Sequence, residues 1–347
     1  LIFTDTAEKA LPHWLKAKNL HINGSNLCTE IFLPTNEQRT AVCCLSSLNL
    51  EYFDEWRHDS QFIDDVMEFL DNVLQYFIEH APNSIKRAKL SAFKERSVGL
   101  GALGFHSYLQ KKGIPFESVI AKSINKQIFS HIRQCCELAD KRLCALRGPC
   151  PDASDAGVMR RFSHWMAIAP NASSSLIVGN TSPSIEPRRA NVYRQDTLSG
   201  AYITKNRHLQ QALKELNLDT EEIWTDIIAH DGSVQHLDIL PQQIRDVFKT
   251  AQEIDQRFII DLAADRQQFI DQGQSVNLFF PADVPIKYLH ACHYLAWKKG
   301  LKSLYYCRSD KLRKADRIGL SIKRQKIEDD INMQSLLNEN TCLACEG

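Results

Sequence analysis

Three side chains with complementary chemistry lie within five residues near the start of the sequence. Asn26, Cys28 and Glu30 occupy alternate positions, so in an extended segment their side chains would point to the same side. The carboxylate could then act as a general base toward a substrate hydroxyl that the amide also contacts. The spacing alone fits equally well a cysteine that packs as a small buried hydrophobe, and this alternative stays open here.

The remaining cysteines indicate thiol chemistry more than metal binding. The chain has eleven cysteines, and none has the paired Cys/His spacing of a zinc site. Cys43 and Cys44 lie in a predicted buried strand, where neighbours point to opposite sides and only one can face a site. Cys342 and Cys345 form a C-x-x-C pair whose dithiol could exchange with a disulfide. With no secretory leader pattern, we expect reduced thiols in the cytoplasm.

The composition excludes some classes of partner. The chain has 347 residues, 44% of them hydrophobic, and a formal net charge of zero. Bulk electrostatics therefore predicts no attraction to nucleic acid or to an anionic membrane, and a phosphate group would have to be held locally. No apolar stretch approaches the roughly 18 residues of a membrane span. Because the sequence does not begin with Met, we expect it to be a piece of something longer.

Hydrophobic periodicity predicts helices that alternate with short buried strands, which favours an α/β architecture with a largely parallel sheet. In the helix that begins at Phe62 and ends before Pro82, seven apolar residues recur at three- and four-residue steps and are expected to share one apolar face. They are Phe62, Val66, Phe69, Leu70, Val73, Leu74 and Phe77. We divide the chain into a barrel-forming part, 1–324, and a flexible tail, 325–347. The other expected elements are strands at 41–50, 275–280 and 302–306, helices at 97–112, 120–146, 206–217, 241–272 and 284–299, and a long loop at 170–205.

A glycine motif, G-x-G-x-x-G, occupies residues 99–104. A dinucleotide site would need a buried strand directly before the first glycine. The preceding residues, 94–97, are polar and charged, which does not fit such a strand. We therefore predict a helix whose glycines allow close packing against a neighbour.

Several segments together resemble the large catalytic subunits of class I ribonucleotide reductases, in their C-terminal half. The matching segments keep the family's order from about residue 20 to about residue 306: SNLCTEIFLPT, AVCCLSSLNL, RSVGLGALGFHSYL, MAIAPNASSSLIVGNTSPSIEPRRANVY, LFFP and LKSLYY. The resemblance implies the second half of a ten-stranded α/β barrel. It also implies radical-based reduction of ribonucleoside diphosphates to 2′-deoxyribonucleoside diphosphates.

The resemblance also implies a role for each candidate residue. Cys28 would become the thiyl radical that abstracts the 3′ hydrogen, with Glu30 as base at the 3′ hydroxyl and Asn26 as a hydrogen-bonding partner. Cys43 would be one of two thiols that reduce the substrate, and the other belongs to the family's N-terminal half. The adjacent Cys44 departs from the family pattern, and the residues downstream favour Cys43.

Two further sites are implied. Ser and Asn before an apolar run are typical of a helix start, whose backbone N–H groups can bind phosphate. The resemblance assigns the substrate diphosphate to this start, although a Ser-rich loop without a ligand is the alternative. Tyr305 and Tyr306 would relay the radical, while ordinary packing of two aromatic rings is the alternative. The diphosphate residues are Asn171, Ala172, Ser173 and Ser174.

The partners follow from the same resemblance. A small subunit would generate the radical at a dinuclear metal site, so we expect no metal and no cofactor in this chain. Thioredoxin or glutaredoxin would reduce the tail cysteines, and an N-terminal half would close the barrel. Two other hypotheses remain: an inactive structural remnant, and a thiol–disulfide exchange protein that uses only the tail.

Overall fold

The computed structural model describes residues 1–197 and 200–309. The tail at 325–347, with Cys342 and Cys345, lies outside the described residues. The strands are β1 (Cys44–Asn49), β2 (Val98–Leu103), β3 (Val192–Thr197), β4 (Gly200–Lys205), β5 (Leu278–Phe280) and β6 (Cys307–Ser309). The helices are α1 (Thr4–Ala10), α2 (His13–Lys16), α3 (Phe53–Trp56), α4 (Phe62–His80), α5 (Lys86–Glu95), α6 (Phe105–Lys111), α7 (Val119–Arg147), α8 (Pro151–Ser154), α9 (Ala172–Ile177), α10 (Arg207–Glu215), α11 (Glu221–Ala229), α12 (Gln242–Val247), α13 (Gln256–Gln267) and α14 (Ile286–Lys298).

A wall of parallel strands forms the centre of the fold. β1 pairs with β2, and β5 pairs with β6, both in parallel. Two isolated parallel bridges, Leu100 to Met166 and Ile168 to Gln274, connect these pairs. The wall therefore runs from β1 through β2 and the segments around 167 and 274 to β6. Helices link its successive strands, as parallel pairing requires, and the predicted α/β architecture is confirmed.

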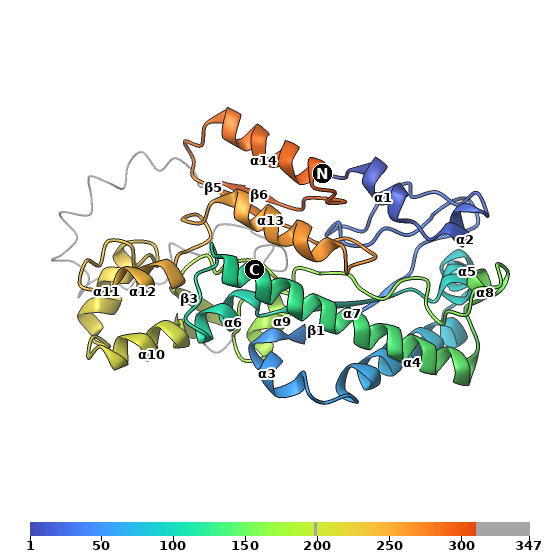
Figure 1. Ribbon diagram of the computed structural model, residues 1–347, viewed down its shortest axis with the longest axis horizontal. Coiled ribbons are helices and arrows are strands. Elements are labelled where there is room, and N and C mark those ends of the chain that lie inside the picture. The colour runs from blue at the N-terminus through green and yellow to red at the C-terminus, as the bar shows by residue number, and fades with distance from the viewer. Residues whose placement is uncertain (198–199, 310–347) are drawn as a thin grey trace.

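Long helices cover this wall on one side (Figure 1). α7 packs against α4 and α13, and α13 also packs against α14. The predicted helices at 62–77, 120–146, 206–217 and 284–299 are present as α4, α7, α10 and α14. On α4, Leu70 and Leu74 of the predicted face are buried as expected, but Phe69 is 61% exposed and Val73 is 40% exposed, so the prediction is only partly confirmed. The buried face is rotated relative to the predicted one and also includes Ile63, Met67 and Ile78.

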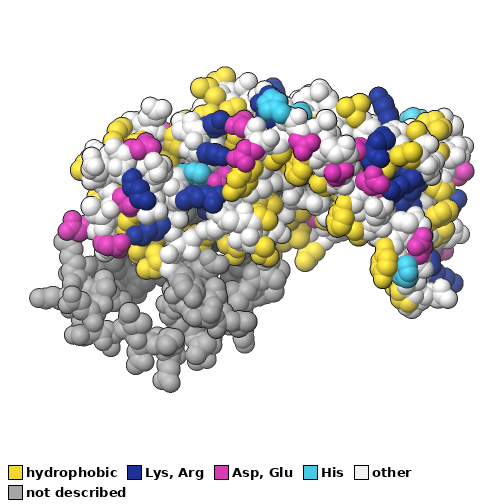
Figure 2. Space-filling view, turned by 90° about the horizontal axis from the view of Figure 1, so that it is seen from below, with side chains coloured by type: hydrophobic (Ala, Val, Ile, Leu, Met, Phe, Trp, Pro, Cys, Tyr) yellow, Lys and Arg dark blue, Asp and Glu magenta, His cyan; other side chains and the backbone are white. Residues whose placement is uncertain are grey.

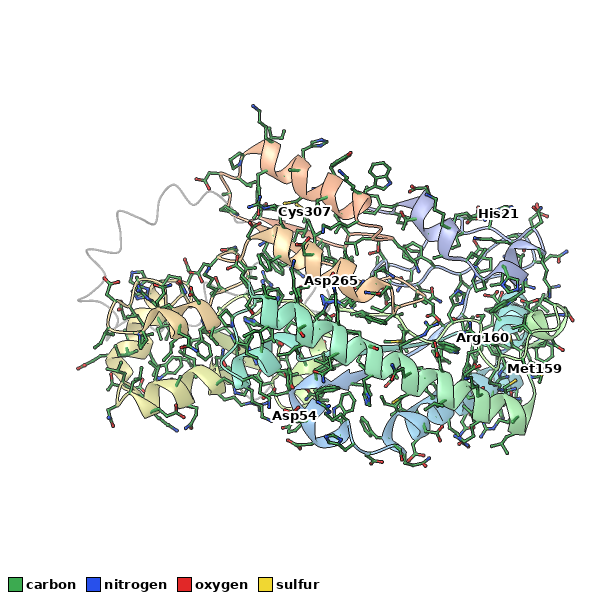
Figure 3. All side chains as sticks on the ribbon, in the orientation of Figure 1. His21, Asp54, Met159, Arg160, Asp265 and Cys307 are labelled. Atoms are coloured by element: carbon green, nitrogen blue, oxygen red, sulfur yellow. The ribbon has the colours of Figure 1, made fainter. Side chains whose placement is uncertain are left out.

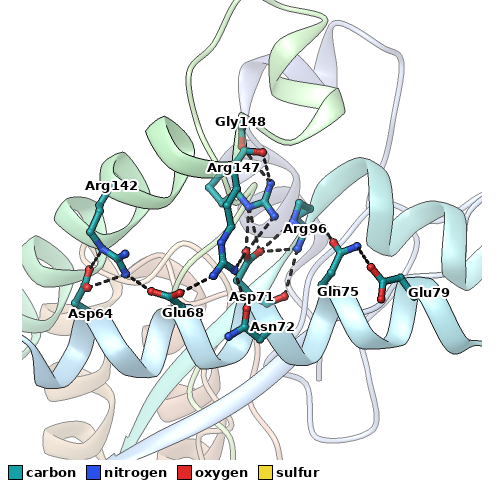
Figure 4. A network of polar contacts seen from close by, with 11 residues as sticks. Asp64, Glu68, Asp71, Asn72, Gln75, Glu79, Arg96, Arg142, Arg147 and Gly148 are labelled. Atoms are coloured by element: carbon teal, nitrogen blue, oxygen red, sulfur yellow. Dashed lines mark hydrogen bonds and ion pairs between the residues drawn. The ribbon is translucent and has the colours of Figure 1, made fainter.

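A charged cluster joins α4 to its neighbours (Figure 4). Asp71, which is fully buried on α4, accepts hydrogen bonds from Arg96 at 2.6 Å, Arg147 at 2.7 Å and Arg161 at 3.0 Å. Burial alone would raise the pKa of Asp71, but the bonds from Arg161 and Arg96 lower it on balance. One carboxylate thus ties α4 to the end of α5, the end of α7 and the segment that enters the wall.

The glycine motif lies on a strand and not on the predicted helix. Every residue of β2 is buried, and helix α6 begins only after Gly104. A Cβ at Gly99 would lie 2.4 Å from the Leu45 side chain, and one at Gly101 would lie 2.4 Å from the Ala167 carbonyl. The glycines therefore allow neighbouring strands to approach each other, and the motif is not in the turn after a strand that a dinucleotide site needs.

Three other segments also differ from the prediction. The expected strand at 302–306 contains only an isolated bridge at Ser303, and β6 begins after it, at Cys307. The expected helix at 241–272 is two helices, α12 and α13, separated by a stretch of turns at 248–255. The expected loop at 170–205 contains the short helix α9 and the antiparallel pair β3–β4.

A second hydrophobic cluster, distinct from the main core, forms a lobe at the left of Figure 1. It is built from α10, α11 and α12, and its most buried side chains include Leu209, Leu213, Trp224 and Ile227. Acidic and basic side chains are interspersed on the face in Figure 2, as the zero net charge suggests. Within residues 1–197 and 200–309, none of the helices is long and apolar enough to cross a membrane.

Candidate active site

Residues 26–30 form a tight turn, so the predicted extended segment is wrong. The Asn26 Oδ1 atom accepts hydrogen bonds from the backbone N–H groups of Glu30 and Ile31, each at 3.1 Å. Thr29 adopts a left-handed backbone with a φ of 62°. Asparagine side chains commonly bond to nearby backbone in this way and so compete with extended structure. Asn26 thus shapes the loop that presents Cys28 and Glu30.

The wall holds this loop through three hydrogen bonds to its carbonyl groups. The Ser275 hydroxyl donates to the Cys28 carbonyl at 2.6 Å, and the Ser303 hydroxyl donates to the Thr29 carbonyl at 2.6 Å. The Gly273 N–H donates to the Glu30 carbonyl at 2.7 Å. Because each donor belongs to the wall near β5 or β6, the loop is fixed against it.

The two tyrosines contact the cysteine of the loop. The Cys28 thiol donates to the Tyr305 hydroxyl at an Sγ–O distance of 3.5 Å, between residues 277 positions apart. The rings of Tyr305 and Tyr306 have centroids 4.1 Å apart. Burial, together with the bonds to Cys28 and Tyr306, raises the pKa of the Tyr305 phenol, so the phenol stays protonated at neutral pH. The three residues form one continuous line of contacts.

Glu30 is a buried carboxyl group beside this line. It is 2% exposed, and burial raises its pKa, while hydrogen bonds from Asn26 and Ser275 oppose the rise. The Ser275 hydroxyl lies 3.2 Å from Glu30 Oε2. A carboxylate whose pKa is raised is a stronger base than an ordinary one and is therefore better suited to accept a proton.

Cys43 and Cys44 pack on opposite sides of the wall. Cys43 packs with Ile31, Leu33 and Ala167, next to the Cys28 loop. Cys44 instead packs toward α4 and α5, in the cluster formed by Leu74, Ile78 and Ala92. The strand thus turns one thiol toward the loop and the other into the helical layer.

The predicted diphosphate residues lie at the start of α9. Asn171 occupies the N-cap position with a left-handed backbone and makes no side-chain cap. Its amide donates instead to the Ala169 carbonyl at 2.9 Å, so the predicted helix start is confirmed, although no asparagine side chain caps it. Ser173 and Ser174 are exposed, and Ala172 is partly exposed. The backbone N–H groups of the first turn are therefore left without a side-chain cap, as an anion site requires.

Sequence reasoning missed several polar residues beside the tyrosines. Asn277, which is 3% exposed, accepts from the Tyr306 N–H at 3.0 Å and donates to Glu186 at 2.7 Å. Burial raises the pKa of Glu186 to about 7. Ser275 and Asn277 are polar residues at alternate positions of a predicted buried strand, and this pattern was the available signal. Cys307, labelled in Figure 3, follows the tyrosines and begins β6 beside α14.

One group of metal-capable side chains lies away from this site, on α11 and the loop that follows it. Asp226, His230 and His236 have ligand atoms within 4.8 Å of one another. The imidazoles lie 3.3 Å and 3.2 Å from oxygens of the Asp226 carboxylate. His236 hydrogen-bonds to the carboxylate, whereas the His230 ring hydrogen-bonds to the Asp226 carbonyl at 2.8 Å. The group shares no residue with the thiol site.

The chain is similar to proteins of one family over almost its whole length. The family model for the ribonucleotide reductase barrel domain matches residues 1–156 and 152–307. The large subunit of ribonucleoside-diphosphate reductase from Invertebrate iridescent virus 3 is 52% identical over 99% of this chain. The corresponding subunit from Invertebrate iridescent virus 6 is 55% identical over 84%. The chain spans 53% of the first relative and 31% of the second.

A solved structure agrees with these matches. The class Id ribonucleotide reductase alpha subunit of Actinobacillus ureae superimposes with a TM-score of 0.84 and 42% identity. The superposition covers 90% of this chain and 58% of that subunit. The family resemblance found in the sequence and the barrel fold that it implied are both confirmed. The chain therefore belongs to the ribonucleotide reductase barrel domain family.

Proposed function

We propose that this chain is the catalytic portion of a ribonucleoside-diphosphate reductase that makes 2′-deoxyribonucleoside diphosphates by radical chemistry. The observation that carries the proposal is the line of contacts from Tyr306 through Tyr305 to Cys28, with the buried Glu30 beside it. Phenols and a thiol in contact can pass a hydrogen atom along the line, because each gives a neutral radical when it loses one.

In the proposed reaction, a radical that arrives through the tyrosines removes the hydrogen from Cys28. The thiyl radical takes the 3′ hydrogen of the ribonucleotide, and Glu30 accepts the 3′ hydroxyl proton. The 2′ hydroxyl leaves as water, and the two electrons for its removal come from Cys43 and a second thiol, which become a disulfide. The Cys28 thiol then returns the 3′ hydrogen, and the radical leaves by the same line.

The diphosphate would lie at the uncapped start of α9, on the N–H groups of Ala172, Ser173 and Ser174 together with Asn171. The backbone of a helix start can hold an anion without a basic side chain, which suits a chain of zero net charge.

The activity would need further protein parts. β1 has only β2 as a strand partner among the described residues, and its Leu45 side chain is 41% exposed, so this edge can accept the strands of a complementary half. That half would supply the second thiol. A small subunit would supply the radical from a dinuclear metal site, and thioredoxin or glutaredoxin would reduce the disulfide by way of Cys342 and Cys345.

The test is reduction of a ribonucleoside diphosphate after mixing this chain with the matching N-terminal half, the small subunit and a dithiol. Activity that needs every component and vanishes in Cys28→Ser supports the proposal. A stable complex by sedimentation without any activity would instead indicate an inactive remnant. Thiol–disulfide exchange that is lost in Cys342→Ser but kept in Cys28→Ser, without any nucleotide reduction, would indicate a thiol exchange protein.

A further inference from the structure

Cys43 lies at the end of a short series of buried polar groups that are joined by hydrogen bonds. The Ser97 hydroxyl donates to Cys43 Sγ at 3.5 Å, and the Gln272 amide nitrogen donates to Ser97 Oγ at 3.2 Å. The Gln272 amide oxygen accepts from the Phe32 N–H at 2.7 Å. Ser97 and Gln272 are both completely buried. The series thus connects the residue before β1, the residue before β2, the 272 segment of the wall and the segment that leaves the Cys28 loop.

The direction of the two amide bonds in this series is fixed by its backbone end. The Phe32 N–H can only donate, so the Gln272 atom beside it must be the amide oxygen. The amide nitrogen therefore faces Ser97 and donates to it. The single hydrogen of the Ser97 hydroxyl is directed to Cys43 Sγ.

We propose that Ser97, oriented by Gln272, is a positioning residue that stabilises the Cys43 thiolate and so makes Cys43 the exchanging thiol in place of Cys44. The inference rests on the proposed function, in which Cys43 enters a disulfide. When an incoming dithiol reduces that disulfide, its thiolate bonds to the partner sulfur and the Cys43 bond breaks. The electron pair then remains on Cys43 Sγ, which takes up a proton afterwards.

The thiolate needs such help because of where it lies. Burial raises the pKa of Cys43 far above its usual range, while the bond from Ser97 opposes the rise. A thiol leaves a disulfide more readily as its pKa falls. Burial also raises the pKa of Cys44, and the charge of Arg96 opposes that rise, but Cys44 packs among aliphatic side chains of the helical layer. The hydroxyl donor and the position beside the loop therefore distinguish Cys43 from Cys44.

The test measures the thiolate directly and does not depend on turnover. In the full-length chain carrying Cys44→Ser, the rate of Cys43 alkylation by iodoacetamide is followed against pH by peptide mass spectrometry. Hydrogen bonds to charged groups are strong enough that Ser97→Ala should slow alkylation roughly tenfold or more at a fixed pH. Ser97→Thr, which keeps the hydroxyl, should restore the rate. Ser91→Ala is the matched control, because Ser91 is also buried but has no hydrogen-bond partner for its hydroxyl among the described residues.

Gln272→Glu tests the orientation itself. A carboxylate oxygen facing Ser97 would accept the serine hydrogen and turn it away from Cys43, so alkylation should slow at least as much as in Ser97→Ala. Equal rates in the parent chain, Ser97→Ala and Gln272→Glu would overturn the inference. Since alkylation needs no substrate, the expected rates together with an inactive reconstituted enzyme would leave the thiolate assignment standing and refute only the proposed reductase function.

Discussion

Replacing Asp71 with Asn removes one charge from the cluster in Figure 4 while keeping the size of the side chain. The carboxylate is fully buried, and the Arg96 and Arg161 side chains are only 4% and 8% exposed. Both guanidinium groups would lose their counter-charge without gaining access to water. Breaking a buried ion pair in this way costs about 3–5 kcal/mol, and the substitution should lower the free energy of unfolding by that amount.

The assay is urea denaturation of the full-length chain, followed by circular dichroism at neutral pH. Asp64→Asn on the same helix is the matched control, because its partner Arg142 is 37% exposed and an exposed pair contributes only about 0–1 kcal/mol. A loss below about 1 kcal/mol for Asp71→Asn, equal to that of the control, would refute the reasoning.

The destabilisation by Asp71→Asn should depend on pH, because the carboxylate stabilises the fold only while it is ionised. The pKa of Asp71 is lower in the folded chain than its ordinary value. Its contribution to stability should therefore be complete above about pH 4 and should be lost as the pH falls through the folded pKa. The difference between Asp71→Asn and the parent chain should shrink accordingly in acid.

The remaining predictions concern the site and the lobe. Tyr305→Phe keeps the ring but removes the hydroxyl in contact with Cys28, so turnover of the reconstituted enzyme should fall to that of Cys28→Ser, while Tyr294→Phe, an exposed control on α14, should change little. Because burial raises the pKa of Glu30, the rate of the reconstituted enzyme should fall as the pH decreases through a pKa above the ordinary glutamate value of about 4.3. A rate–pH profile whose acidic fall lies at the ordinary value would contradict the role of Glu30 as base. The same acidic fall in Glu30→Gln would also contradict it. Burial would raise the pKa of Glu51, but bonds from His208, Arg207 and Thr181 lower it to about 2. The contribution of Glu51 to stability should therefore be complete above about pH 4.3 and be lost toward pH 2. Thermal melts of the parent chain and of Glu51→Gln measure this contribution as a difference in melting temperature. An equal difference at pH 7 and at pH 2.5 would contradict the prediction.

Local patterns in the sequence predicted most of the helices and the first strand. The apolar spacing of α4, α7, α10 and α14 has the period of a helix, and this period depends only on neighbours along the chain. The alternation in β1 also separated Cys43 from Cys44, since side chains on a strand alternate in direction. The order of the motifs was enough to identify the family and therefore the barrel.

The sequence did not predict features that depend on distant partners. Residues 98–103 form a strand and not a helix because β1 and the segment around 167 lie on either side of them, and Gly99 and Gly101 make room for both. The residues at 26–30 form a turn and not an extended segment because Asn26 bonds to their backbone and donors from the wall hold their carbonyl groups.

The types of the reactive residues are thus a property of the sequence, while their juxtaposition is a property of the fold. Cys28 and Tyr305 are 277 positions apart, and no local pattern relates them. Ser97 and Gln272 are ordinary polar residues in the sequence, and only the tertiary structure aligns them with Cys43. The physical reason is that a buried polar group must find its hydrogen-bond partner in space, and the chain can supply that partner from any position.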